Sequence, residues 1–105
     1  MKTYEFIRTH VSLPELLTSI AEEAAELSQA ALKYRRTLLP ESQNPTDKDK
    51  AEALRDLLTE YADVVCTMSV SGVASKPEEY DFIETTVRRK AQRWATRLAE
   101  GLVQK

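Results

Sequence analysis

The chain is short of the residues that make cross-links, metal cages and tight turns. Its 105 residues include one cysteine, one histidine and two glycines. A single cysteine cannot form an internal disulfide, and one histidine beside one cysteine cannot supply a zinc cage. Two glycines against twelve alanines and twelve leucines argue against a turn-rich β-sandwich and favour long helices. We therefore expect an all-α fold.

Long hydrophobic runs and a large excess of one charge are also missing. No apolar stretch approaches the roughly 18 residues that a membrane-spanning helix requires. The first ten residues, MKTYEFIRTH, lack the apolar block of a secretory signal, so we expect a cytoplasmic protein with no membrane partner. The net charge of −2 argues against a nucleic-acid polymer as the partner.

Capping residues and periodicity predict three long helices in a single domain. Ser12 is placed as an N-cap, with Pro14 in the first turn and Glu15 completing a capping box. Gly72 is a natural helix stop. The expected elements of the domain 1–105 are an extended arm or a short extra helix at 1–11, helices at 13–36, 47–71 and 77–100, and a loop at 37–46.

Each predicted helix has an apolar face that should pack against a partner helix. On the first helix this face is Leu13, Leu17, Ile20, Ala24, Leu27, Ala31 and Tyr34. On the second it is Leu54, Leu58, Tyr61, Val65 and Met68, and on the third it is Tyr80, Ile83, Val87, Ala91, Trp94 and Leu98. We expect Trp94 and Cys66 to be buried as core residues.

Acidic residues are segregated from basic ones along the first two helices. Residues 12–32 hold four carboxylates and no lysine or arginine, and residues 56–75 hold three more without a cation. Helical spacing places Glu22, Glu23 and Glu26 on one turn, and it places Glu60 and Asp63 on a narrow arc of the second helix. The oppositely charged partners that surface helices usually carry at i+4 are missing. Each of the two helices therefore presents one acidic patch.

The second patch is flanked by apolar residues, where a carboxylate is costly unless a positive charge meets it. A hard divalent cation answers that need, because Mg²⁺ or Mn²⁺ takes oxygen ligands and leaves positions for substrate oxygens. The alternative is an ordinary hydrated face, and on a helical wheel Glu22 and Glu26 fall on the solvent side.

The third helix is basic where the first two are acidic. By helical angle, Lys90, Arg93 and Arg97 are its best candidates for contact with an anion. Carboxylates that hold a metal beside cationic side chains are what phosphoryl or nucleotidyl chemistry requires. The alternative is that these cations, with Lys33, Arg35 and Arg36 on the first helix, only balance helix dipoles.

Two short motifs carry a family resemblance. Glu22-Glu23-Ala24-Ala25-Glu26-Leu27 and Glu60-Tyr61-Ala62-Asp63 resemble the EExxEL and ExxD pair of the MazG-like, all-α nucleoside triphosphate pyrophosphohydrolases. The resemblance covers about residues 12–100, including the helix order, and only the two motifs are specific. The sequence departs from the tightest family members in the length of the segment between Glu26 and Glu60.

The resemblance implies a magnesium-dependent enzyme. Glu23, Glu26, Glu60 and Asp63 would hold Mg²⁺, or alternatively Mn²⁺, and Glu22, Glu23 and Glu26 would form the catalytic motif. Water would attack the α-phosphorus of a nucleoside triphosphate and release a nucleoside monophosphate and pyrophosphate. The resemblance also implies a helical bundle completed by oligomerisation, as a homodimer or homotetramer.

A non-catalytic helical oligomerisation or interaction module with the same fold is the alternative function. Its acidic faces would bind a basic partner, and its basic helix would pair with such faces in an oligomer. The two functions differ over the motif carboxylates, because the enzyme needs all of them and the module tolerates their neutralisation.

Overall fold

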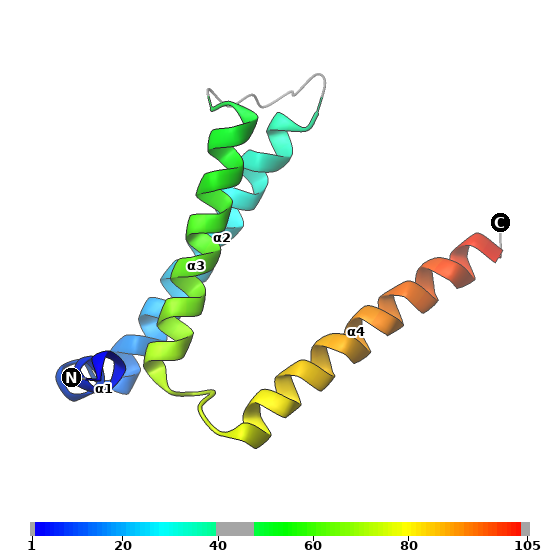
Figure 1. The fold of residues 1–105 in the computed structure, drawn as a ribbon. Coiled ribbons are helices and arrows are strands. Elements are labelled where there is room, and N and C mark those ends of the chain that lie inside the picture. Colours follow the sequence, from blue (N-terminus) through cyan, green and yellow to red (C-terminus); the bar gives the residue numbers. More distant parts are fainter. Residues whose placement is uncertain (1, 40–47, 104–105) are drawn as a thin grey trace. The chain divides into compact units, whose positions relative to one another are not determined.

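The computed structural model describes residues 2–39 and 48–103, and in these ranges the chain forms helices and no strands (Figure 1). The described part of the chain contains four helices: α1 (Thr3–His10), α2 (Leu13–Thr37), α3 (Lys50–Ser71) and α4 (Pro77–Val103). The all-α prediction is confirmed: α2, α3 and α4 are long helices, and α1 is a short fourth helix at the N-terminus. The expected loop at 37–46 lies mostly outside the described residues, and its first residue, Thr37, is still helical.

The chain divides into two compact units, Met1–Val73 and Ala74–Lys105, and each is described by itself. The first unit holds α1, α2 and α3, and the second holds α4. The single-domain organisation stays a prediction. No helix in the described ranges combines the length and the apolar character needed to cross a bilayer.

The helix ends follow from local chemistry. The Ser12 hydroxyl accepts the Glu15 N–H at 3.3 Å and donates to the Glu15 carboxylate at 3.1 Å, so the predicted start of α2 is confirmed. α3 begins at Lys50, because the Asp49 side chain accepts the Glu52 N–H at 2.8 Å and so caps the helix there. Residues 48 and 49 of the predicted helix 47–71 are therefore not helical, and residue 47 lies outside the described residues. Gly72 ends α3 with φ +75°, a left-handed conformation that glycine adopts without a steric penalty.

α4 is capped by a carboxylate that reaches back beyond the first turn. The Glu79 carboxylate accepts the N–H groups of Ser75 and Lys76 at 3.2 and 2.9 Å, and these bonds lower the pKa of Glu79. The helix passes through Gly101 and continues to Val103, so it is longer than the predicted 77–100. A helix-interior glycine costs only about 1 kcal/mol, which does not end a long helix.

Residues 1–11 contain a helix and not an extended arm. α1 packs against α3 in the first unit. The Arg8 guanidinium donates to the carbonyl oxygen of Val70 at 2.9 Å, which satisfies one of the carbonyls left free in the last turn of α3. α1 thus closes the end of α3 where Val70 and Ser71 are buried.

α2 and α3 run antiparallel, side by side (Figure 1). Buried and half-buried positions recur along them at alternating steps of three and four residues. We call these positions the α2–α3 seam: Leu16, Ile20, Glu23, Leu27, Ala30 and Tyr34 on α2, and Ala53, Asp56, Glu60, Asp63, Thr67 and Val70 on α3. The most buried members are small or aliphatic, and carboxylates lie between them.

The predicted apolar faces are partly wrong. On α2 the packed face is displaced by about one residue, so Leu16 is 6% exposed whereas Leu13 and Leu17 are 49% and 46% exposed. On α3 the expected main face is turned away from α2, and Leu58 and Tyr61 are 59% and 60% exposed. Apolar periodicity locates an apolar face, but it does not say which partner covers that face.

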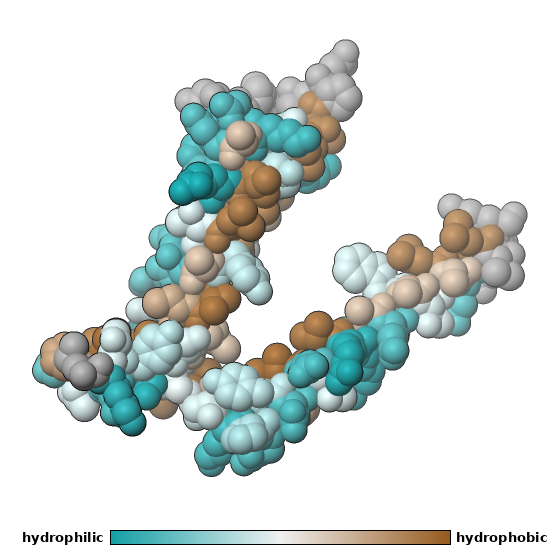
Figure 2. Space-filling view, in the orientation of Figure 1, coloured by the Kyte–Doolittle hydropathy of each residue, from teal (hydrophilic) through white to brown (hydrophobic). Residues whose placement is uncertain are grey.

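Two single-residue expectations are also wrong. Cys66 is exposed on α3, and Trp94 is 70% exposed on α4. α4 has no buried residue among those described, because nothing else in its own unit packs against it. Apolar side chains accordingly reach the surface of each unit (Figure 2).

Candidate metal centre

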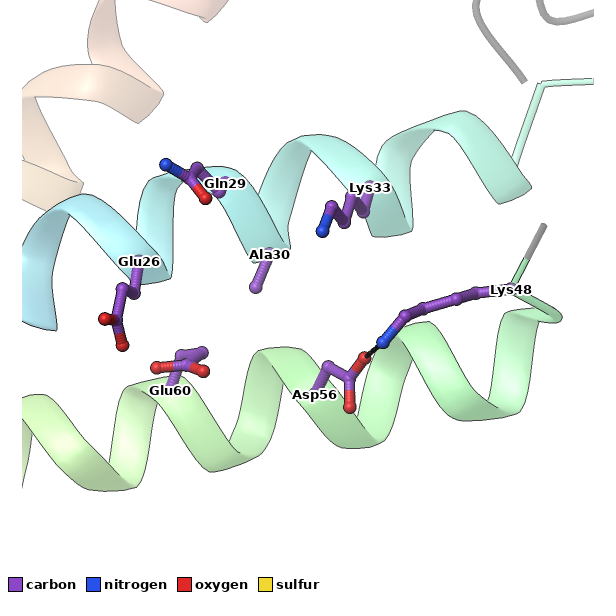
Figure 3. Close-up of a pocket in the computed structure, with 7 residues that line it drawn as sticks. All are labelled: Glu26, Gln29, Ala30, Lys33, Lys48, Asp56 and Glu60. Carbon is purple, nitrogen blue, oxygen red and sulfur yellow. Dashed lines mark hydrogen bonds and ion pairs between the residues drawn. The ribbon is translucent and has the colours of Figure 1, made fainter. Parts of the chain in front are cut away.

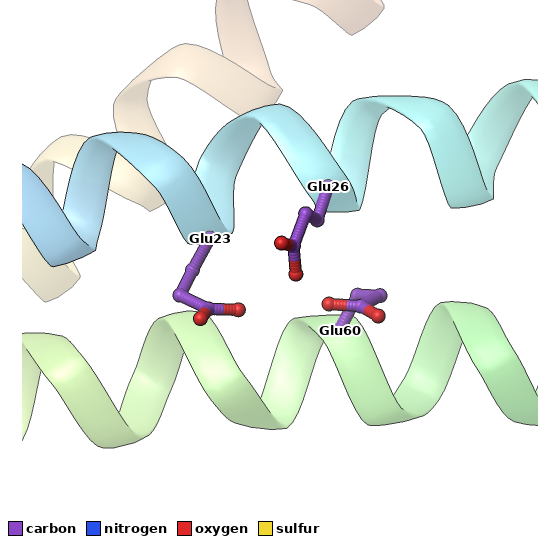
Figure 4. Close-up of side chains that lie close together, drawn as sticks. All are labelled: Glu23, Glu26 and Glu60. Carbon is purple, nitrogen blue, oxygen red and sulfur yellow. The ribbon is translucent and has the colours of Figure 1, made fainter.

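Three carboxylates converge between α2 and α3 (Figure 4). Glu23 and Glu26 come from α2 and Glu60 comes from α3, and one oxygen from each lies within 4.8 Å of the others. Glu23 and Glu60 are half-buried and Glu26 is exposed. Three of the four predicted metal ligands thus lie together between α2 and α3, which form an antiparallel helical hairpin.

The seam explains why these carboxylates meet. Glu23 lies seven residues from both Leu16 and Ala30, so it faces α3 as these two buried residues do. Glu60 lies seven residues after Ala53, which is 1% exposed. Small and aliphatic contacts on either side hold the helices close and bring the carboxylates between them into contact.

The electrostatics of the cluster are unfavourable for charged groups. The pKa of Glu23 and the pKa of Glu60 are both raised, chiefly because burial removes hydration and next because Glu26 repels the charged form. Oε2 of Glu23 and Oε2 of Glu60 are inaccessible to water and have no hydrogen-bond partner among the described residues. With all three carboxylates ionised, two acceptor oxygens are left unsatisfied in the contact between the helices. A hydrogen bond with the Glu26 carboxyl, which requires a proton, is a further cause of the raised pKa of Glu23 and of Glu60.

Asp63 and Glu22 surround this cluster. Asp63 is half-buried one turn after Glu60, and its charge contributes to the raised pKa of both Glu23 and Glu60. Within the described ranges, Asp63 is not among the carboxylates whose oxygens lie within 4.8 Å of one another. Glu22 is exposed and adds a smaller repulsion at Glu23. The roles of Asp63 as a ligand and of Glu22 as a catalytic group stay predictions.

A polar groove of about 380 Å³ extends from the carboxylates along the hairpin (Figure 3). Its lining includes Glu26, Glu60, Asp56, Lys33, Lys48 and Gln29. Lys48 forms an ion pair with Asp56 across the first turns of α3. Glu26 and Glu60 thus lie at one end of the groove, and Asp56 lies toward the other end with the two ammonium groups.

The two cations of this groove, Lys33 and Lys48, are not among the predicted substrate-binding residues. Lys33 is seven residues after Glu26, so helical spacing alone placed it on the same face. Its expected role at the helix C-terminus is mainly to balance the helix dipole, and contact with phosphate is the lesser alternative. Lys48 and Gln29 had no assigned role, and Lys48 precedes α3 in a polar segment without periodicity. Only the folded hairpin brings Lys48 beside α2.

The predicted substrate-binding cations lie in the other unit. Lys90, Arg93 and Arg97 are all exposed on α4. The structure gives the acidic cluster and these cations in separate units. Their contact with substrate stays a prediction.

The residues present fit a hard divalent cation. The donor set consists of carboxylate oxygens, which Mg²⁺ and Mn²⁺ prefer. A cation would satisfy the two orphaned oxygens and offset the mutual repulsion that raises the pKa of Glu23 and Glu60. Exposed acidic groups also occur without an ion, so the orphaned oxygens are the more specific observation.

No family model, curated protein or solved structure matches this chain. The resemblance to the MazG-like pyrophosphohydrolases therefore stays an interpretation of the two motifs.

Proposed function

We propose that this protein is a magnesium-dependent nucleotide pyrophosphohydrolase. It would convert nucleoside triphosphates to nucleoside monophosphates and pyrophosphate by attack of water on the α-phosphorus. The observation that carries the proposal is the convergence of Glu23, Glu26 and Glu60, with two of their oxygens buried and unpartnered. The sequence motifs supply the reaction class.

The chain's own residues have distinct parts in this proposal. Glu23 and Glu60 would hold the cation from opposite helices, because each directs an unsatisfied oxygen into the contact between α2 and α3. Glu26 completes the three-carboxylate set from the exposed side, where substrate can approach. Asp63 would join as a fourth ligand, and Glu22 would orient water. When bound, the cation supplies Lewis-acid polarisation of a phosphoryl oxygen and lowers the pKa of water.

The exposed apolar faces support a homo-oligomer, either a dimer or a tetramer. On α3, Leu58 and Tyr61 are more than half exposed and lie on a face that α2 does not cover. On α4, Trp94 and Leu98 are 70% and 61% exposed. Large apolar patches of this kind mark interaction surfaces. An oligomer would also offer the groove Lys90, Arg93 or Arg97 from another copy.

The proposal is tested by product identity. The full-length protein is incubated with a panel of nucleoside and deoxynucleoside triphosphates, in excess Mg²⁺ and separately in chelator, and the products are identified by phosphorus NMR. We expect nucleoside monophosphate and pyrophosphate with Mg²⁺ and no turnover in chelator. Release of orthophosphate and a nucleoside diphosphate would refute attack at the α-phosphorus.

The interaction-module alternative draws on the same exposed apolar faces. It is separated from the enzyme by Glu23→Gln and Asp63→Asn, which a module tolerates and an enzyme does not. Self-association that persists in both variants, together with an absence of turnover in the unmodified protein, would favour the module.

A further inference from the structure

The groove between α2 and α3 has charges of opposite sign at its two ends (Figure 3). Glu26 and Glu60 lie at the end where the carboxylates converge. Lys33 projects into the groove from α2, on the face that Glu26 also occupies. Seven residues of helix separate Glu26 from Lys33, or about 10 Å along the axis.

Lys33 differs from the other ammonium group of the groove. Lys48 is already engaged in an ion pair with Asp56. Among the residues that the structure describes, Lys33 forms no ion pair. Lys33 is therefore the cation that can meet a ligand without first giving up a carboxylate.

The net charge of the groove depends on whether a cation is bound. The lining carries three carboxylates and two ammonium groups, so the bare groove has a small negative excess that disfavours a polyanion. A divalent cation at the carboxylate end reverses that sign. An anionic ligand should therefore bind only after the cation has bound.

We infer that a divalent cation binds first at Glu26 and Glu60, and that a chain of phosphates then binds along the groove. One end of the phosphate chain would meet the cation, and the distal phosphate would meet Lys33. The inference rests on the proposed function, because it uses the same carboxylates. It goes further in making Lys33 the residue that distinguishes a triphosphate from a monophosphate. A single phosphate at the carboxylate end would leave Lys33 without a partner, whereas a triphosphate reaches toward it.

The test uses calorimetry on the full-length protein with inorganic tripolyphosphate and orthophosphate as probes. Each probe is titrated in saturating Mg²⁺ and again in chelator. Lys33→Gln is compared with Arg35→Gln, which removes an exposed cation from the same helix end but outside the groove lining. Binding of Mg²⁺ alone is followed by thermal shift in both variants.

We expect tripolyphosphate to bind the unmodified protein and Arg35→Gln in Mg²⁺, and neither of them in chelator. Lys33→Gln should weaken tripolyphosphate binding at least about tenfold, because a charge-assisted contact is lost. Its thermal shift with Mg²⁺ alone should be retained. Equal tripolyphosphate affinity in Lys33→Gln and Arg35→Gln would overturn the inference, and so would undiminished binding in chelator.

This outcome is independent of turnover. Lys33-dependent tripolyphosphate binding without nucleotide hydrolysis would retain the groove inference and refute the proposed enzyme. If the unmodified protein hydrolyses nucleotides and Lys33→Gln changes neither turnover nor tripolyphosphate affinity, the proposed enzyme is retained and the inference is refuted.

Discussion

The two long faces of α3 differ in chemistry and in what covers them. Toward α2 the helix presents half-buried acidic residues: Asp56, Glu60 and Asp63. Toward solvent it presents large apolar residues that are 38–60% exposed: Leu54, Leu58, Tyr61 and Val65. A helix of a self-sufficient monomer buries its apolar face and exposes its charges.

The difference indicates that neither face of α3 is fully satisfied by the helices of its own unit. The acidic face fits a cation, because its carboxylates have lost hydration and repel one another. The apolar face fits a second protein surface, because exposed aliphatic and aromatic side chains gain free energy when they leave water.

The largest expected effect comes from the acidic face. Glu60→Gln keeps the size of the side chain and removes the charge that α3 brings to the cluster. We expect turnover of nucleoside triphosphate in Mg²⁺ to fall by roughly 10²–10³-fold, the usual cost of removing one electrostatic contact in an active site. The measurement is the initial rate of pyrophosphate release. Glu52→Gln, on an exposed position of the same helix, is the control and should leave the rate unchanged.

The apolar face is tested by a charge. Leu58→Asp places a carboxylate in a surface that we expect to be buried between copies, so the dissociation constant of the oligomer should rise by about 30-fold or more, equivalent to about 2 kcal/mol. Analytical ultracentrifugation across a dilution series measures this change. If the unmodified chain is monomeric at every concentration, the assignment of this face to a second copy is wrong.

Both faces of α3 end at Gly72, which gives a smaller and purely conformational test. Gly72→Ala forces a Cβ into a left-handed backbone, at a cost of about 1–2 kcal/mol in the free energy of unfolding. The added Cβ would meet Arg8 Nη1 at 3.5 Å, an ordinary contact, so the loss comes from the backbone. Gly101→Ala should instead stabilise α4 by about 0.5–1 kcal/mol, because nothing lies within 4 Å of its Cβ position. Urea unfolding of both variants gives the two signs.

The smallest expected effect is the pH dependence of the metal-free protein. The raised pKa of Glu23 and of Glu60 means that the folded state binds protons that the unfolded state releases. Stability should therefore fall as the pH rises above 4.5, the ordinary glutamate value, through the raised pKa values. Glu79 acts in the opposite direction and in a different window, because its lowered pKa removes stability only as the pH falls below 4.5.

Thermal melting in chelator across this pH range measures both windows. Glu23→Gln should melt higher than the unmodified protein at neutral pH and should show a flatter pH dependence above 4.5. Added Mg²⁺ should stabilise the unmodified protein most at the higher pH values. An unchanged melting temperature in Glu23→Gln would show that the cluster carries no repulsion when it is empty of metal.

Local signals in the sequence were reliable where a single side chain decides the outcome. The hydroxyl of Ser12 and the backbone freedom of Gly72 act within a few residues, so the ends of α2 and α3 that depend on them were predicted correctly. The start of α3 was placed too early, because Asp47 and Asp49 are both suitable caps and periodicity does not choose between them.

Packing signals were less reliable. The predicted apolar face includes Leu17 and not Leu16, whereas Leu16 is the buried residue of the two. Both are apolar and lie on adjoining positions of the helical wheel, so periodicity does not choose between them. The close approach at Ala30 and Ala53 selects the face that contains Leu16 and Glu23. Trp94 was assigned to a core because it is large and apolar, but its own unit offers nothing to cover it.

The amino-acid sequence by itself determined the helical class, through composition, and the capped helix ends, through local hydrogen bonds. It also determined that Glu23, Glu26 and Glu60 fall into two acidic patches free of cations, through the 3.6-residue repeat. Only the tertiary structure decided that the patches face each other across the seam, that two of their oxygens lose water, and that Lys33 and Lys48 enter the same groove. The reason is that the rotation of one helix against another is set by which side chains allow close packing, and that choice involves residues far apart in the chain.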